Sequence, residues 1–261
     1  MKATLITGAS SGIGEAFARR LAEEKHDLVL VARSEEKLHA LRDDLMAEHK
    51  ITAHYIAIDL TGFEADKRLF EETEQHGIEV DWLINNAGFG SMGDFVKLDL
   101  EKELRMIDLN ISCLVSLTHR YLQKMRERKS GTIINVSSAA GFQPIPFMAT
   151  YAATKAFVTS FSEAMAEENR PYGIQVMALC PGSTKTNFFE AANMDRAFQA
   201  KGQQTAEEVV ETALQGISRG RSKIVSGWSN YIGSLAGTMA PNALTTRLIA
   251  KALRSKYQET E

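Results

Sequence analysis

Tyr151 and Lys155 are four residues apart, and of all the pairs in this chain they are the best suited to acid–base chemistry. Positions four apart on a helix lie about one turn apart on the same face, so the Lys155 ammonium can lie beside the Tyr151 ring. A phenol has an unperturbed pKa of about 10, and a neighbouring cation lowers that pKa by stabilising the phenolate. The pair is suited to a proton-transfer site, although Tyr-x3-Lys alone favours an ordinary helix with a surface lysine.

A hydroxyl and a glycine-rich turn add to this pair. Ser138 lies thirteen residues before Tyr151, at the end of a predicted strand, where its hydroxyl can donate a hydrogen bond to a substrate oxygen. Near the N-terminus, Gly8-x3-Gly12-x-Gly14 follows an apolar run and opens a helical pattern. That context is the one a phosphate-binding turn requires, although a tight strand-to-helix turn would look the same.

The glycine-rich turn predicts contacts with a dinucleotide. Glycines permit positive φ and a close approach of the backbone to a pyrophosphate, and the helix N-terminus offers amide donors at the positive end of its dipole. The residues expected to make these contacts are Gly8, Ser10, Ser11, Gly12, Ile13 and Gly14.

Composition limits the class of protein. The chain has 261 residues, is 44% hydrophobic and carries a net charge of −3 without a basic block, which favours one globular unit and argues against a nucleic-acid partner. Cys113 and Cys180 are far apart and lack metal-ligand spacing, so we expect a reducing compartment, packing roles for both thiols and no metal. No secretory signal precedes the first predicted strand, and we therefore expect a cytoplasmic protein.

Short β-branched runs alternate with longer helical patterns along the whole chain. This alternation predicts an α/β fold, a Rossmann-like doubly wound parallel sheet of about seven strands with helices on both faces. We expect one domain, residues 1–261, in which 227–261 form a C-terminal extension. The predicted strands are 2–7, 28–32, 52–57, 82–84, 132–136, 175–179 and 223–226. The predicted helices are 12–24, 35–48, 64–75, 100–128, 150–170 and 206–218, and segments 144–146, 187–204 and 228–242 are expected to be loops or short helices.

The chain resembles the classical short-chain dehydrogenase/reductase family over residues 2 to about 226. Three motifs carry this resemblance: the spacing of the three glycines, Asn85-Asn86-Ala87-Gly88 after the fourth predicted strand, and Tyr-x3-Lys. The resemblance implies hydride transfer between a nicotinamide and a carbonyl or alcohol. Tyr151 would then be the proton donor in reduction and the base in oxidation. The family pattern places the catalytic hydroxyl at Ser138 and not at the adjacent Ser137.

The resemblance implies roles for further residues. Lys155 would hold the nicotinamide ribose, and Asn110 would complete the catalytic set at a helix irregularity whose backbone carbonyl supports a water chain to the lysine. Asp59 is equally consistent with a turn or helix cap, and Asn85 with a purely structural role. The remaining positions implied to contact the cofactor are Asp59 and Leu60 for adenine, Asn86, Ala87 and Gly88 for a ribose, and Pro181, Gly182, Thr184 and Thr186 for the carboxamide.

Arg33 favours NADP(H) as the cofactor. Sites specific for NAD usually place an acidic residue after the second strand, where this chain has Ala32 and Arg33. A guanidinium can bind the 2′-phosphate with two hydrogen bonds and stack on adenine. Ser34 would help to bind that phosphate, or would only cap the next helix.

Apolar residues dominate the loops expected near the nicotinamide. They favour a hydrophobic ketone, aldehyde or oxoacyl substrate over a sugar, although some of them would only pack the loops. A catalytically silent NADP-binding regulator is the alternative, while the short region after residue 226 argues against a sugar-nucleotide epimerase. The apolar residues are Phe89, Met92, Phe142, Ile145, Phe147, Met148, Phe188, Phe189 and Met194.

The segment from Leu244 to Lys256 predicts a basic amphipathic helix. Leucine and isoleucine pairs four residues apart lie among four cations. Such a helix can dock on the body of the protein or on a second subunit, which we favour, or it can lie on an anionic membrane. By resemblance, a homodimer or homotetramer is expected, formed through the helices at about 100–128 and 150–170.

Overall fold

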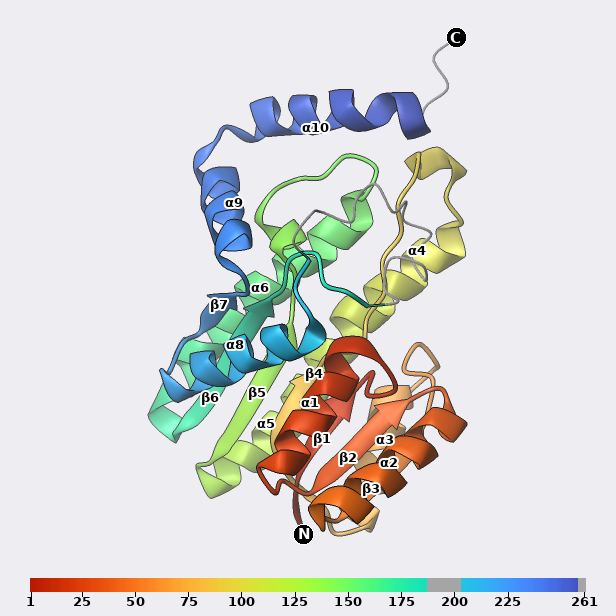
Figure 1. The fold of residues 1–261 in the computed structure, drawn as a ribbon, viewed down its shortest axis with the longest axis vertical. Helices are drawn as coiled ribbons and strands as arrows, with labels where there is room; N and C mark the ends of the chain where they lie inside the picture. Colours follow the sequence, from red (N-terminus) through yellow and green to blue (C-terminus); the bar gives the residue numbers. More distant parts are fainter. Residues whose placement is uncertain (187–202, 258–261) are drawn as a thin grey trace.

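The protein, described from a computed structural model that covers residues 1–186 and 203–257, is built on one seven-stranded sheet (Figure 1). All neighbouring strands are parallel, and their order is β3-β2-β1-β4-β5-β6-β7. The Rossmann-like doubly wound fold expected from the sequence is thereby confirmed. The strands are β1 (Lys2–Thr7), β2 (Leu28–Ala32), β3 (Ala53–Ala57), β4 (Glu79–Asn85), β5 (Gly131–Val136), β6 (Ile174–Cys180) and β7 (Lys223–Val225).

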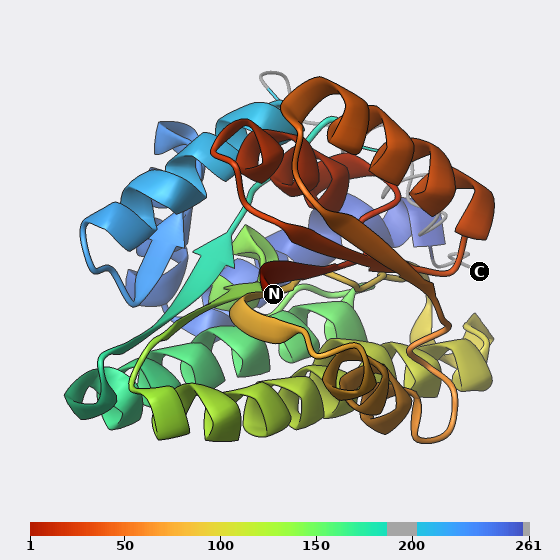
Figure 2. The ribbon, with the colours of Figure 1, turned by 90° about the horizontal axis from the view of Figure 1, so that it is seen from below.

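Helices cover both faces of the sheet (Figure 2). One layer contains α1 (Gly12–Glu23), α2 (Glu35–His49) and α8 (Ala206–Ser218), and the other contains α3 (Ala65–Gln75), α5 (Leu114–Arg128) and α6 (Ala149–Asn169). Successive side chains of a strand point to opposite faces, so Leu5 and Ile6 of β1 pack in different cores. Burial on both sides explains why the central strands are largely apolar.

The switch point of the sheet lies between β1 and β4. From β1 the sheet extends through β2 and β3 on one side and through β4 to β7 on the other. In an open α/β sheet the loops that leave the carboxyl ends at such a point diverge and form a crevice. The fold thus brings the loops after β1, β4 and β5 to one edge.

The region predicted as one helix, 100–128, is a helix with a π-helical segment inside it. Helix α4 (Leu100–Ile107) leads into the π segment η2 (Asp108–Cys113) and then into α5. The Asn110 side chain exchanges hydrogen bonds with the backbone of Phe89 and donates to Thr154 Oγ1 at 3.1 Å. The π segment confirms the helix irregularity at Asn110 that the family resemblance implied, although periodicity alone predicted one continuous helix.

Residues 228–242, expected to be loops or short helices, contain a regular helix of three turns, α9 (Trp228–Met239). Its Gly, Ser and Asn residues have low helix propensity, but they are small enough for close packing. A Cβ built on Gly237 would lie 2.8 Å from Gln143 Oε1, next to the short helix η3 (Ala139–Phe142). Tertiary packing therefore overrides local propensity in this segment.

The last helix, α10 (Asn242–Tyr257), packs one side on the body of the protein. Leu253 and Ile249 contact a cluster that includes Met92 and Met148. The Tyr257 ring stacks on the Phe147 ring, with 5.4 Å between the ring centroids. Within residues 1–186 and 203–257, no helix is long and apolar enough to cross a membrane.

A chain of buried amides joins the centre of the sheet to α6. Asn85 Nδ2 donates to Asn135 Oδ1 at 2.9 Å, and Asn135 Nδ2 donates to Ser162 Oγ at 2.9 Å. Asn135 and Ser162 are fully buried. A buried polar group that loses its partner incurs its full desolvation cost.

We expect Asn135→Ala to lower the free energy of unfolding by about 2–3 kcal/mol, because it removes one hydrogen-bond partner from each of Asn85 and Ser162. Urea unfolding followed by circular dichroism measures this value. Gln75→Ala, at an exposed position at the end of α3, is the control and should change it by less than about 0.5 kcal/mol. Equal effects of the two substitutions would contradict the assignment.

Candidate active site

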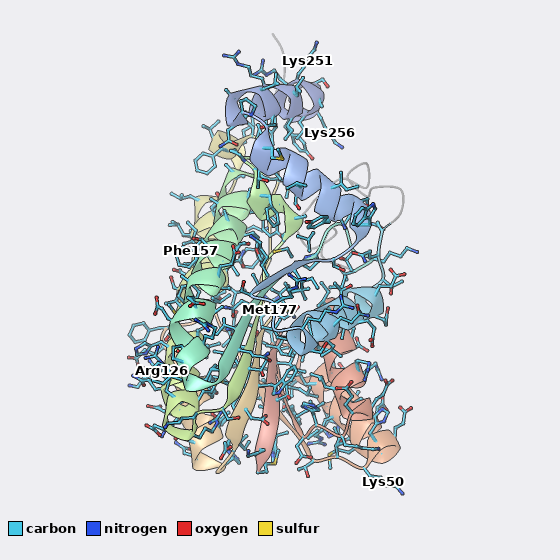
Figure 3. The ribbon with its side chains drawn as sticks, turned by 90° about the vertical axis from the view of Figure 1, so that its left-hand side faces the viewer. Lys50, Arg126, Phe157, Met177, Lys251 and Lys256 are labelled. Atoms are coloured by element: carbon cyan, nitrogen blue, oxygen red, sulfur yellow. The ribbon has the colours of Figure 1, made fainter. Side chains whose placement is uncertain are left out.

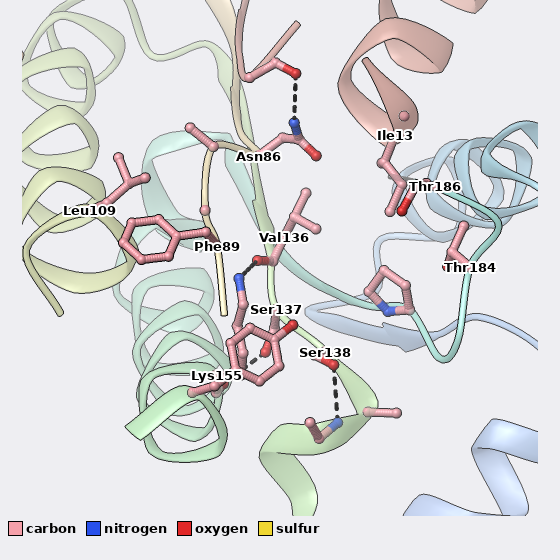
Figure 4. A pocket seen from close by; sticks show the side chains of 18 of the residues that line it. Ile13, Asn86, Phe89, Leu109, Val136, Ser137, Ser138, Lys155, Thr184 and Thr186 are labelled. Carbon is pink, nitrogen blue, oxygen red and sulfur yellow. Dashed lines mark hydrogen bonds between the residues drawn. The ribbon is translucent and has the colours of Figure 1, made fainter. Parts of the chain in front are cut away.

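A cavity of about 1140 Å³ opens at the carboxyl edge of the sheet (Figure 4). It reaches from the loop after β2 to the start of α9, and it is lined by most of the residues predicted from the sequence. Among the residues predicted to be catalytic or to bind the cofactor, Gly14 and Asn110 alone lie outside its lining. Those in the lining are Gly8, Ser10, Ser11, Gly12, Ile13, Arg33, Ser34, Asp59, Leu60, Asn86, Ala87, Gly88, Ser138, Tyr151, Lys155, Pro181, Gly182, Thr184 and Thr186.

The turn between β1 and α1 forms one wall and requires its glycines. Gly8 and Gly12 have φ of +68° and +58°, in the left-handed region that favours glycine. A Cβ on Gly14 would lie 2.2 Å from the Gly8 carbonyl oxygen, so Gly14 acts through close packing of the turn and not through contact with a ligand. The N-cap side chain of Ser11 makes no hydrogen bond to the first turn of α1, so that helix end suits an anion.

Thr7 and Asn86 hold this turn against the end of β4. The Thr7 hydroxyl oxygen accepts hydrogen bonds from the backbone N–H groups of Asn86 and Ala87 at 3.0 and 2.9 Å. Asn86 Nδ2 donates to the Thr7 carbonyl oxygen at 2.9 Å. Asn86 therefore holds the loop after β1 against the loop after β4, and it also lines the cavity.

Ser137 and Ser138 follow β5 and point in different directions. Ser137 is buried and donates to the Lys155 carbonyl oxygen at 2.7 Å, which ties the sheet to α6. Ser138 lines the cavity and forms a hydrogen bond with the Tyr151 side chain. Both serines line the cavity, but the Ser137 hydroxyl is engaged with the Lys155 carbonyl oxygen and with Thr159 Oγ1, so Ser138 is the hydroxyl better placed to reach a ligand.

Burial dominates the electrostatics of Tyr151. It raises the pKa of the phenol to about 12, and the hydrogen bond with Ser138 lowers that pKa in part. Lys155 Nζ lies 5.8 Å from the centroid of the Tyr151 ring. The net upward shift differs from the downward shift expected from the sequence, because burial outweighs the favourable interactions. Tyr151 is therefore a neutral phenol around pH 7 and carries a proton that it can donate.

Lys155 is a buried cation at the base of the cavity. Its Nζ donates to the Val136 carbonyl oxygen at 2.8 Å (Figure 4), and its side chain shares the cavity wall with Tyr151. Burial lowers the pKa of Lys155 to about 8. Asn110 lies behind it, close to Gly88: a Cβ on Gly88 would lie 2.9 Å from Asn110 Oδ1 and 3.5 Å from Lys155 Nζ.

The far end of the cavity carries positive charge. Arg33 is exposed just after β2, and its charge contributes to the lowered pKa of Asp59. Burial opposes this lowering, and hydrogen bonds from Thr61 to Asp59 add to it. Asp59 thus forms a turn as well as part of the wall. Lys37, on the first turn of α2, also lines this end.

Apolar side chains line the cavity near Tyr151. Four of the nine predicted residues are there, namely Phe89, Phe142, Ile145 and Met148. Met92 and Phe147 instead pack in the cluster beneath α10. Phe188, Phe189 and Met194 lie outside the described residues.

The lining residues that were not predicted from the sequence include a cation, Lys37, and a group on α9. Lys37 follows Arg33 by four residues, and this spacing could have predicted that both cations lie at the same end of the cavity. The α9 residues had no such signal, because their segment was expected to form loops or short helices with no role in the site. They are Ser229, Asn230, Gly233 and Ser234.

The fold and the cavity define a doubly wound protein with a ligand site at the switch point of its sheet. Comparison with known proteins identifies its family. The model of the short chain dehydrogenase family matches residues 2–197. The chain belongs to this family and is an oxidoreductase. In the part of the chain that the structure describes, no group of three His, Cys, Asp or Glu side chains could hold a metal ion.

Individual relatives agree with this assignment. The very-long-chain 3-oxoacyl-CoA reductase of Mus musculus is 29% identical over 97% of this chain and 81% of that protein. A short-chain dehydrogenase of Sphingobium yanoikuyae, solved in complex with NADPH, has a TM-score of 0.81 and 31% identity, covering 100% of this chain and 98% of that one. A structure of a 7β-hydroxysteroid dehydrogenase has a TM-score of 0.86 and 26% identity, with 95% and 96% covered.

We expect Lys155→Met to raise the free energy of unfolding by roughly 1–3 kcal/mol at pH 7. The pKa of Lys155 is about 8 in the folded protein, below the ordinary lysine value of 10.5. The unfolded chain therefore binds more protons between these pH values, and the stability of the wild type rises with pH there. Urea midpoints measured from pH 6 to 10 should show the largest gap between variant and wild type below pH 8. A gap that does not narrow above pH 8 would contradict the lowered pKa.

Proposed function

We propose that this oxidoreductase is an NADPH-dependent carbonyl reductase that also runs in reverse as an alcohol dehydrogenase. The observation that carries the proposal is the hydrogen-bonded pair of Ser138 and Tyr151 in the cavity, with buried Lys155 beside it. A glycine-rich turn and two cations at the other end of the same cavity suit a dinucleotide phosphate.

The chain's own residues divide the work of proton transfer. When bound, the nicotinamide cofactor would supply the hydride that reaches the carbonyl carbon. Ser138 donates a hydrogen bond to the carbonyl oxygen, and Tyr151 transfers its phenolic proton to that oxygen. The positive charge of Lys155 stabilises the phenolate that remains. In the oxidation direction, Tyr151 accepts the proton of the alcohol.

The preference for NADP(H) rests on Arg33 and Lys37. Both line the end of the cavity next to the loop after β2, where a 2′-phosphate would need positive charge. The related dehydrogenase of Sphingobium yanoikuyae was solved with NADPH, which agrees with this choice. The left-handed glycines and the uncapped end of α1 fit the pyrophosphate of the same cofactor.

The substrate is an apolar ketone, aldehyde or oxoacyl compound. Aromatic and aliphatic side chains surround the position of Tyr151, and the cavity is larger than the range of about 300–1000 Å³ typical for a single small ligand. One similar protein is named as a very-long-chain 3-oxoacyl-CoA reductase and another as a 7β-hydroxysteroid dehydrogenase, and both names agree with this substrate class.

We further propose that the protein is a homodimer or homotetramer in the cytoplasm. Large apolar side chains on α4 and α6, two helices in contact with each other, are exposed in the single chain. Leu104 is 51% exposed and Phe157 39% exposed. Such a surface fits burial against a second copy through the helices predicted from the sequence.

Tyr151→Phe is expected to lower kcat for carbonyl reduction at least a hundredfold, because it removes the proton donor while keeping the ring. Affinity for NADPH, measured by fluorescence titration, should change little. Consumption of NADPH with a panel of apolar ketones, aldehydes and oxoacyl thioesters provides the activity readout. Unchanged turnover in the variant would refute the proposed role of Tyr151.

That panel also decides between the two classes of function. A catalytically silent regulator would bind NADPH and consume none of it with any of the carbonyl compounds. In that case NADPH should instead alter the binding of a partner protein.

Arg33→Ser is expected to raise KM for NADPH roughly ten- to a hundredfold and to leave KM for NADH nearly unchanged, because charge-assisted hydrogen bonds are worth about 1.5–3 kcal/mol. Arg221→Ser is the matched control, since Arg221 is exposed and lies outside the lining of the cavity. Equal use of NADPH and NADH by the wild type would refute the preference.

A further inference from the structure

Helix α9 has two faces of opposite character. One face lines the cavity with small residues, including Ser229, Asn230 and Gly233. The other face carries large apolar side chains at spacings of three and four residues, which form a single stripe along the helix. These side chains are between 47% and 78% exposed, and they are Trp228, Tyr231, Ile232, Leu235 and Met239.

Helix α10 continues this exposed surface. Its Ile249, Leu253 and Tyr257 face the body of the protein, whereas Leu244 and Leu248 are 55% and 61% exposed. Three exposed cations share the outward side of α10 with these two leucines, because each lies three or four residues along the helix from a leucine or from another of the cations. These cations are Arg247, Lys251 and Arg254. Together, the α9 stripe, the two leucines and the three cations are called here the α9–α10 surface.

The segment that carries the α9–α10 surface has charges of one sign. Between residues 222 and 257 the sequence holds five cations and no Asp or Glu, although acidic residues outnumber basic ones in the whole chain, 33 to 30. A symmetric contact with a second copy through this surface would bring the same cations together without a carboxylate to pair them. An anionic partner with an apolar interior matches both properties.

We propose that the α9–α10 surface docks the protein on a membrane leaflet that contains anionic lipid. Trp and Tyr side chains are suited to the boundary between headgroups and acyl chains, and Lys and Arg are attracted to anionic headgroups. An amphipathic helix of this composition lies in the plane of the interface. The attachment is peripheral, and it places the wall of the cavity formed by α9 next to the lipid.

Co-sedimentation of the full chain with lipid vesicles tests the proposal without any cofactor or carbonyl compound. We expect binding to vesicles of phosphatidylcholine mixed with phosphatidylglycerol, weak binding to phosphatidylcholine alone, and weaker binding to the mixed vesicles as salt screens the cations. Because no turnover is measured, failure of this test and failure of the proposed reaction are distinguishable.

Two variants of the α9–α10 surface should bind the mixed vesicles more weakly than the wild type. Arg247→Gln combined with Lys251→Gln is expected to weaken it about twenty-fivefold, or about fivefold for each cation. Leu235→Ser is expected to weaken it several-fold, because it removes an apolar side chain from the stripe.

The matched controls lie away from the α9–α10 surface. Lys50 and Lys129 are exposed lysines in left-handed conformation, which asparagine tolerates, and Lys50 lies at the end of the molecule opposite Lys251 (Figure 3). Phe63 is 90% exposed and precedes α3. The double variant Lys50→Asn/Lys129→Asn and the single variant Phe63→Ser should bind the mixed vesicles as the wild type does.

Either of two results would overturn the proposal. One is an absence of binding to the mixed vesicles, and the other is an equal loss of binding in variants and controls. If binding is absent and Leu235→Ser also lowers the molecular mass measured by light scattering, the α9–α10 surface is instead a contact between copies of the chain.

Discussion

The geometry of the site depends on how α6 is fastened to the end of β5. Lys155 Nζ donates to the Val136 carbonyl oxygen, and Ser137 donates in return to the Lys155 carbonyl oxygen. Gly141 permits the close packing that follows, because a Cβ there would lie 2.7 Å from the Lys155 carbonyl carbon. These contacts bring Tyr151 of α6 within hydrogen-bond reach of Ser138, which neither element could achieve alone.

This fastening places a charged group where a stable core would have an apolar one. Lys155 and Asn110 are 5% and 1% exposed, and the loop after β4 passes close to both. The protein thus retains buried polar groups at a cost in stability, in exchange for a site of defined geometry. The π segment contributes to the same end, since it holds the Asn110 amide against the backbone of Phe89.

Sequence patterns predicted the elements that obey local rules. The parallel strands, the glycine-rich turn and the members of the cavity wall followed from periodicity, from left-handed glycines and from the order of the motifs. Periodicity alone predicted one continuous helix over 100–128, and only the family resemblance implied the irregularity at Asn110. Residues 228–242 were expected to form loops or short helices, but the extent of α9 did not follow from its small residues, which pack on η3. The raised pKa of Tyr151 was not predicted, because it depends on burial.

The family model ends at residue 197, whereas α9 and α10 begin at residues 228 and 242. The acid–base groups of the cavity therefore lie within the residues that the family model matches, and one side of the cavity wall is built by the C-terminal part beyond them. Phe147, held in left-handed conformation, stacks on Tyr257 and so connects that C-terminal part to the loop beside Tyr151. Substrate range can consequently diverge during evolution by changes in the last thirty or so residues, while the machinery of hydride and proton transfer is left intact.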